Sequence, residues 1–136
     1  MPSISESDII AEVDALVEEF GTNHLAKCMY FDHLLMYADD DLRAMRVIPV
    51  EEAAGVEPVC IVGHLIKRLE PENWIKMVNG GICGTSLQDL PYEGITLKLV
   101  EASGMSEALA NLQAEQDRGE TWGNARNKFK RELGVS

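Results

Sequence analysis

Hydrophobic residues recur at helical spacing in the first part of the chain. They predict an amphipathic helix that ends at Gly21, because residues three and four positions apart share one face of a helix. Ser5 or Ser7 can cap its start, and Gly21 is placed as its C-terminal stop. Its apolar face consists of Ile9, Ile10, Val13, Leu16, Val17 and Phe20.

The next segment, Thr22 to about Tyr37, is apolar around most of its circumference, which predicts a buried helix. Asp32 falls inside its apolar stripe, where an unpaired carboxylate is costly, so we expect it to have a partner or to act as a functional acid. The run Asp39-Asp40-Asp41 ends the segment and can cap a short helix through Arg46. Residues 47–58 then form a connector, with one helical turn at Glu51 to Ala54.

The longest apolar block is Val59 to Ile66, which ends at Lys67-Arg68. Its β-branched residues also fit a buried strand, but Leu65, Ile66 and Leu69 continue one helical face, so we predict a helix. Gly63 in the middle of this helix predicts a close approach by another backbone. Pro71 begins a further helix with Trp74, Ile75 and Val78 on its apolar face.

The remainder of the chain predicts one loop, one ambiguous segment and two helices. Residues 79–93 are a loop, and residues 94–100 are a short helix or extended connector, because a strand here has no obvious partner. Ser106 can cap one helix, and the last helix starts at Thr121 and ends at Gly134. The predicted fold is all-α: a compact single-domain bundle over residues 1–136, with about six or seven helices, several of them short.

Composition narrows the class of protein. A chain of 136 residues with 46% hydrophobic content suits one domain without a stabilising disulfide or metal. The start of the chain does not resemble a signal peptide, and its longest apolar run is far shorter than the roughly 20 residues that span a bilayer. Three cysteines without a CxxC pair indicate reduced thiols. We therefore expect a cytoplasmic protein that does not bind a membrane.

The formal net charge of −11 is concentrated in the first half of the chain. The negative electrostatic field of these residues disfavours direct binding to nucleic acid and favours a partner with a basic surface. The alternative is that the excess carboxylates simply keep the protein soluble. The basic residues Arg126, Lys128, Lys130 and Arg131 in the last helix indicate a solvated face more than a phosphate site. The candidate acidic docking face consists of Glu12, Glu18, Glu19, Asp39, Asp40 and Asp41.

Two pairs of residues suggest metal chemistry. His24 and Cys28 are four positions apart, as are Cys60 and His64, so two helices could supply a tetrahedral zinc site. Both cysteines also lie in apolar stripes, where a thiol behaves as a small hydrophobe. The primary prediction is no metal and no cofactor, and a zinc-stapled helical bundle is an alternative.

A possible polar site involves Asp32, His33 and His64, which could lie between two helices. A site there would suit a small enzyme or a protein that binds a nucleotide or another ligand. The sequence contains no nucleophile elbow, Walker loop, HExxH motif or dinucleotide-binding fingerprint. No catalytic residue is therefore assigned.

Eight positions in the second half of the chain form one pattern: Cys60, Gly63, Leu65, Ile66, Leu112, Gln113, Asp117 and Trp122. At these positions the chain resembles a loosely defined group of small uncharacterised phage and prophage proteins. These contain a Cys-x-x-Gly-x-Leu-Ile block, a Leu-Gln-x-x-His-Asp segment and a terminal helix that opens with Trp. Gln116 stands where that pattern usually has His.

The resemblance implies a phage origin, and hence the cytoplasm of an infected bacterium, but no reaction. Small size and an acidic first half favour an accessory protein that binds and modulates a host or defence protein without catalysis. The expected partner has a basic surface, and assembly into a homo-oligomer is also possible.

Overall fold

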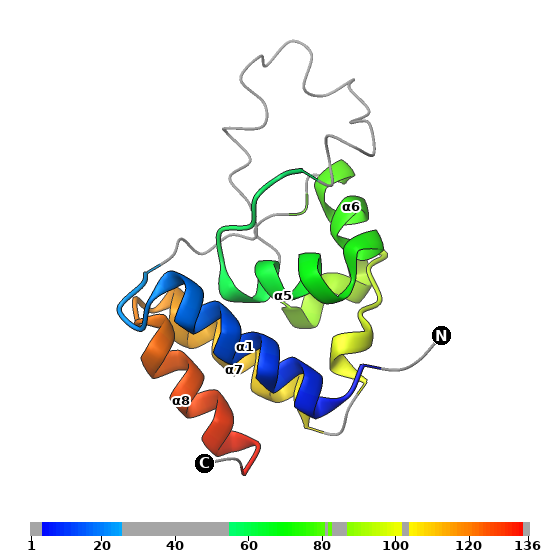
Figure 1. The fold of residues 1–136 in the computed structure, drawn as a ribbon. Coiled ribbons are helices and arrows are strands. Elements are labelled where there is room, and N and C mark those ends of the chain that lie inside the picture. Colours follow the sequence, from blue (N-terminus) through cyan, green and yellow to red (C-terminus); the bar gives the residue numbers. More distant parts are fainter. Residues whose placement is uncertain (1–3, 26–54, 81, 83–86, 102–103, 135–136) are drawn as a thin grey trace.

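The computed structural model describes residues 4–25, 55–80, 82, 87–101 and 104–134 (Figure 1). The regular structure of these residues is entirely helical, which confirms the predicted compact all-α fold. The helices are α1 (Glu6–Phe20), α5 (Ile61–Leu69), α6 (Pro71–Asn79), the 3-10 helices η1 (Leu87–Glu93) and η2 (Lys98–Val100), α7 (Met105–Asp117) and α8 (Trp122–Glu132).

Helix α1 has the local signals that the sequence predicts at both ends. Ser5 is the N-cap: its hydroxyl accepts a hydrogen bond from Asp8 N at 3.1 Å, and Asp8 reaches back to Ser5 N. Gly21 ends the helix with a φ of 100°, a conformation that favours glycine. The buried face consists of Ile9, Val13, Leu16 and Val17.

Helix α5 lies at the centre of the fold. It contacts α1, α6 and α7, and every residue from Ile61 to Ile66 is buried. The apolar block is therefore a central helix, as predicted. Figure 1 shows α1, α7 and α8 grouped together, with α5 and α6 to one side of them. The side chains of Trp74, Trp122 and Phe129 are among the largest that are fully buried between these helices.

Several predicted elements differ in the structure. Residues 22–25 form a turn and extended chain, not the start of a helix, and Leu25 is 58% exposed. Ser106 does not cap α7, because that helix begins one residue earlier, after Gly104 with a φ of 77°. The predicted loop at 79–93 contains η1. Residues 94–100 are a connector that ends in η2, in agreement with the prediction.

None of the helices in the described ranges has the length and apolar character needed to cross a membrane.

Candidate functional site

The N-terminus of α5 is held by two side chains. Cys60 is the N-cap, and its Sγ accepts a hydrogen bond from Gly63 N at 3.2 Å. Gln116 of α7 reaches the same helix end, where its Oε1 accepts from Ile61 N at 2.8 Å. These acceptors satisfy amide groups that have no partner within the helix.

Burial makes the Cys60 thiol unreactive. The residue is 2% exposed, and this burial raises the pKa of the thiol to about 12. At neutral pH the thiol therefore stays protonated, whereas a nucleophile needs the thiolate. Cys60 is a capping and packing residue.

Two glutamines of α7, Gln113 and Gln116, accept hydrogen bonds from two separate segments of the chain. Gln116 is 1% exposed, and besides accepting from α5 it donates from Nε2 to Asp117 Oδ1 at 3.0 Å. Burial raises the pKa of the Asp117 carboxyl. Gln113, one turn earlier, accepts from Leu87 N at 3.0 Å, at the start of η1. Gln113 and Gln116 thus both have structural roles in this chain.

Two histidines surround a pair of aromatic rings. The His64 ring lies 4.7 Å from Phe20 and 5.7 Å from Trp122, centroid to centroid. The His24 ring lies 5.4 Å from Phe20 and 4.5 Å from Trp122. Burial, helped by the positive charge of Arg68, lowers the pKa of His64 to about 4. His64 is therefore a neutral, buried member of an aromatic cluster at pH 7.

The N-terminus of α8 rests on the turn that follows α1. Trp122 N donates to His24 O at 3.0 Å, and Gly123 N donates to Thr22 O at 2.9 Å. A Cβ on Gly123 would lie 2.8 Å from Thr22 O, so the two backbones meet closely here. The close approach predicted for Gly63, which is buried in α5, stays a prediction.

The structure brings some of the predicted site residues together. His24 and His64 contact the same two rings, whereas the Cys60 sulfur accepts an amide hydrogen. Within the described ranges, no group of three or more histidine, cysteine, aspartate or glutamate side chains could hold a metal ion. The other predicted positions lie outside the described residues: Cys28, Asp32, His33, Asp39, Asp40 and Asp41.

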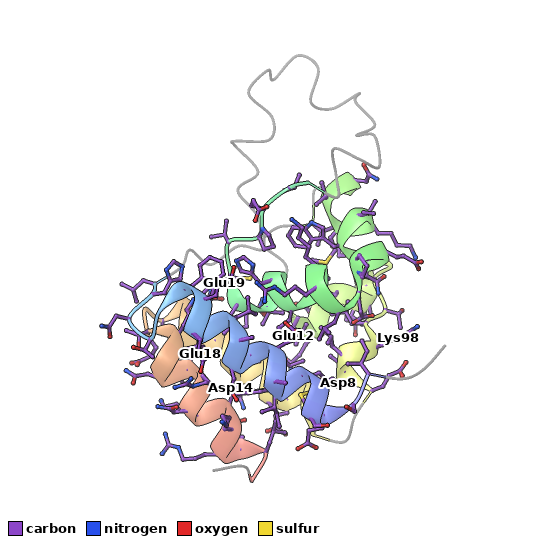
Figure 2. All side chains as sticks on the ribbon, viewed as in Figure 1. Asp8, Glu12, Asp14, Glu18, Glu19 and Lys98 are labelled. Carbon is purple, nitrogen blue, oxygen red and sulfur yellow. The ribbon has the colours of Figure 1, made fainter. Side chains whose placement is uncertain are left out.

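The acidic side chains of α1 divide between two neighbouring helices (Figure 2). Glu12 and Glu19 both pair with Arg68 of α5, and Glu12 Oε2 lies 3.4 Å from the guanidinium. Asp14 pairs with Lys130 at 3.2 Å and with Arg126 at 3.7 Å, both on α8. Glu18 is exposed and makes no ion pair with the described residues.

The basic residues of α8 are mostly neutralised by these contacts. Besides the pairs to Asp14, Lys128 lies 3.0 Å from Glu115 and lowers the pKa of that carboxyl. The basic face predicted from the sequence is therefore an ion-paired surface between α8 and its neighbours. Arg131 is exposed and has no ion pair within the part of the chain described.

A groove of about 600 Å³ lies between the N-terminal half of α1 and the junction of α5 with α6. Glu70 builds its floor, since it is 6% exposed and its carboxylate accepts from Lys98 N at 2.7 Å, Leu99 N at 3.0 Å and Asn73 Nδ2 at 3.0 Å. The lining residues are Ile4, Asp8, Ala11, Glu12, Leu69, Glu70, Pro71, Glu72, Asn73, Lys76 and Lys98.

The sequence analysis did not identify this groove. Its one local signal is Glu70, a carboxylate directly before a helix that begins with proline. The lysines come from α6 and η2, which are far from α1 in sequence, so only the fold places them beside Asp8 and Glu12.

Comparison with known proteins finds no matching family, no matching curated protein and no matching solved structure.

Proposed function

We propose that this protein is a non-catalytic binding protein whose acidic α1 surface docks on a basic surface of a partner protein. The observation that carries this proposal is an imbalance between exposed acids and available cations. Every arginine and lysine of α5 and α8 except Arg131 already has an ion pair. Asp8 and Glu18 are the exposed carboxylates of α1 that have no ion pair within the described chain.

An unneutralised acidic surface has a direct physical consequence. It attracts a basic partner over about one Debye length, roughly 10 Å at moderate salt, and repels nucleic acid and anionic lipid. Complementary charge accelerates encounter and orients the two proteins. The resemblance to phage proteins suggests that the partner is a host or defence protein in the cytoplasm of an infected bacterium.

The buried residues of the sequence motif support a function on the surface. Cys60 and Gln116 both bind amide groups of α5, and Trp122 is enclosed by aromatic rings. These residues support the fold from inside. The carboxylates of α1 stand at the surface, where a partner can reach them.

A pull-down from bacterial lysate, followed by calorimetry with the purified partner, tests this proposal. We expect a specific partner whose affinity falls steeply between about 50 mM and about 200 mM salt, because charge drives the association. Glu18→Lys on α1 should weaken binding by about tenfold, equivalent to 1.4 kcal/mol.

The matched control is Glu107→Lys on α7, which makes the same charge change outside α1. It should leave the affinity within about twofold of wild type. Recovery of no specific partner, an affinity insensitive to salt, or equal losses in the two variants would contradict docking through α1.

A further inference from the structure

Lys76 and Lys98 differ from most cations of the described chain, because neither has an ion pair there. Six other basic residues are paired: Lys67, Arg68, Arg118, Arg126, Lys128 and Lys130. In a chain of net charge −11, a cation has many carboxylates available to it. Two unpaired lysines that line one groove are therefore a feature to explain.

The groove combines an apolar lining with two kinds of charge. Ile4, Ala11, Leu69 and Pro71 supply the apolar surface. Asp8 and Glu12 lie along the α1 side, and Lys98 lies on the neighbouring η2 segment (Figure 2). Glu72 and Lys76 come from α6. An occupant must match apolar, negative and positive surface at once.

Some of the lining carboxylates are already engaged, and others remain available. Glu12 pairs with Arg68 of α5. Glu70 accepts three hydrogen bonds from Asn73, Lys98 and Leu99, so it supports the floor and not a ligand. Asp8 Oδ2 accepts one long bond of 3.4 Å from Ser5 N. Glu72 is exposed and has no ion pair within the described ranges. Free carboxylate oxygens and free ammonium groups therefore border the same apolar surface.

We propose that this groove binds an apolar peptide segment of the partner that carries one basic and one acidic side chain. The basic side chain pairs with Asp8 and shares Glu12 with Arg68, and the acidic side chain pairs with Lys76 and Lys98. A volume of about 600 Å³ accommodates several side chains of such a segment. The inference rests on the proposed function, because it assigns the partner's contact segment.

Fluorescence anisotropy with full-length protein and labelled peptides of one apolar sequence provides the test. The peptides carry Lys and Glu, Lys alone, Glu alone, or Gln at both positions. The peptide with both charges should bind about tenfold more tightly than the Gln peptide, and the singly charged peptides should lie between them. Binding by none of the peptides, or equal binding by all four, would overturn the proposal.

Charge reversal then locates the contacts. Lys98→Glu should weaken the peptides that contain Glu by about tenfold and should not weaken the peptide with Lys alone. Replacing the peptide's Glu by Lys should restore binding to this variant. Arg131→Glu is the control, since Arg131 also has no ion pair within the described residues and does not line the groove; it should leave every affinity unchanged.

The alternative outcomes are distinct. If Arg131→Glu weakens the peptides as much as Lys98→Glu, binding follows net charge and the groove proposal fails. If the peptide with Glu alone binds as tightly as the doubly charged one, the groove is an anion site and the proposal also fails. If a purified partner loses affinity with Glu18→Lys but not with Lys98→Glu, the groove proposal fails while the proposed function stands. Thermal melts of the Lys98→Glu, Arg131→Glu and Glu18→Lys variants should show that each of them is folded.

Discussion

Gln116 caps a helix from a distant part of the chain. Its Oε1 accepts from Ile61 N, 55 positions away in sequence, and the residue is 1% exposed. A buried amide that loses its acceptor costs about 1–3 kcal/mol, because it leaves water without gaining a partner. Gln116 of α7 therefore supports the central helix α5.

Gln116→Leu should lower the free energy of unfolding by about 1–3 kcal/mol, as measured by urea denaturation. The control is Gln88→Leu, an exposed glutamine of η1, which should change stability by no more than about 0.5 kcal/mol. Equal, small effects of the two substitutions would show that the bond to Ile61 contributes nothing to stability.

His64 should make stability depend on pH in the mildly acidic range. Its pKa is about 4 in the folded protein against an ordinary 6.5, so the unfolded chain binds more protons between these values. The free energy of unfolding therefore falls as the pH drops from about 6.5 to about 4, by about 3 kcal/mol from this group. Nearby Arg68 and Lys67 favour the neutral ring, whereas Glu57 and Glu19 favour the charged one.

Denaturation of His64→Leu and His64→Phe across this pH range checks the assignment. Both variants should lose this part of the pH dependence, whatever their absolute stability. A slope between pH 6.5 and pH 4 as steep as that of wild type in both variants would assign the effect to other groups.

At the level of elements, the contact between α8 and the turn after α1 depends on a missing side chain. A Cβ at position 123 would meet Thr22 O at 2.8 Å and Thr22 Cβ at 2.9 Å, and both belong to a turn that also caps α8. Gly123→Ala should destabilise the protein by about 1–3 kcal/mol because a backbone must move.

The matched control for this substitution is Asn127→Ala, at an exposed position of the same helix. It should be within about 0.5 kcal/mol of wild type in a thermal or urea melt. If Gly123→Ala is as stable as the control, the turn yields without cost and the close approach does not constrain the fold.

Helices with local signals were predictable from the sequence. Ser5 and Gly21 bound α1, Pro71 begins α6 and Thr121 caps α8, and each signal lies within or next to its own helix. The turn at 22–25 was not predictable in this way, because Leu25 fits the apolar stripe of a helix that continues into the following residues. The backbone carbonyls of this turn accept hydrogen bonds from the amides of Trp122 and Gly123, which are about a hundred positions away in sequence.

The candidate site likewise contains residues that the sequence could identify and residues that only the fold identifies. His64 and Cys60 were recognisable as candidates from residue type. Only their burial in the fold shows that the His64 ring is neutral and that the Cys60 thiol stays protonated. Glu70, Lys76 and Lys98 carry no motif. Their importance comes from meeting α1 in the fold, which sequence spacing does not encode.

For the molecule as a whole, Arg68 neutralises part of the acidic surface of α1, as Arg126 and Lys130 do at Asp14. Arg68 contacts Glu12 and Glu19, and its own pKa is raised by these carboxylates. Arg68→Gln should free both acids and tighten binding to a basic partner by about threefold. Because the pairs are partly exposed, the loss of stability should stay below about 1 kcal/mol. Calorimetry with the purified partner measures the affinity, and unchanged or weaker binding would contradict docking on this side of α1.

The most direct test of the account compares a surface variant with a core variant in one binding experiment. The account predicts that Glu18→Lys weakens partner binding at unchanged melting temperature, whereas Gln116→Leu lowers the melting temperature but binds normally while folded. The opposite pattern, in which folded Gln116→Leu loses the partner and Glu18→Lys keeps it, would place the function in the buried motif and contradict the account.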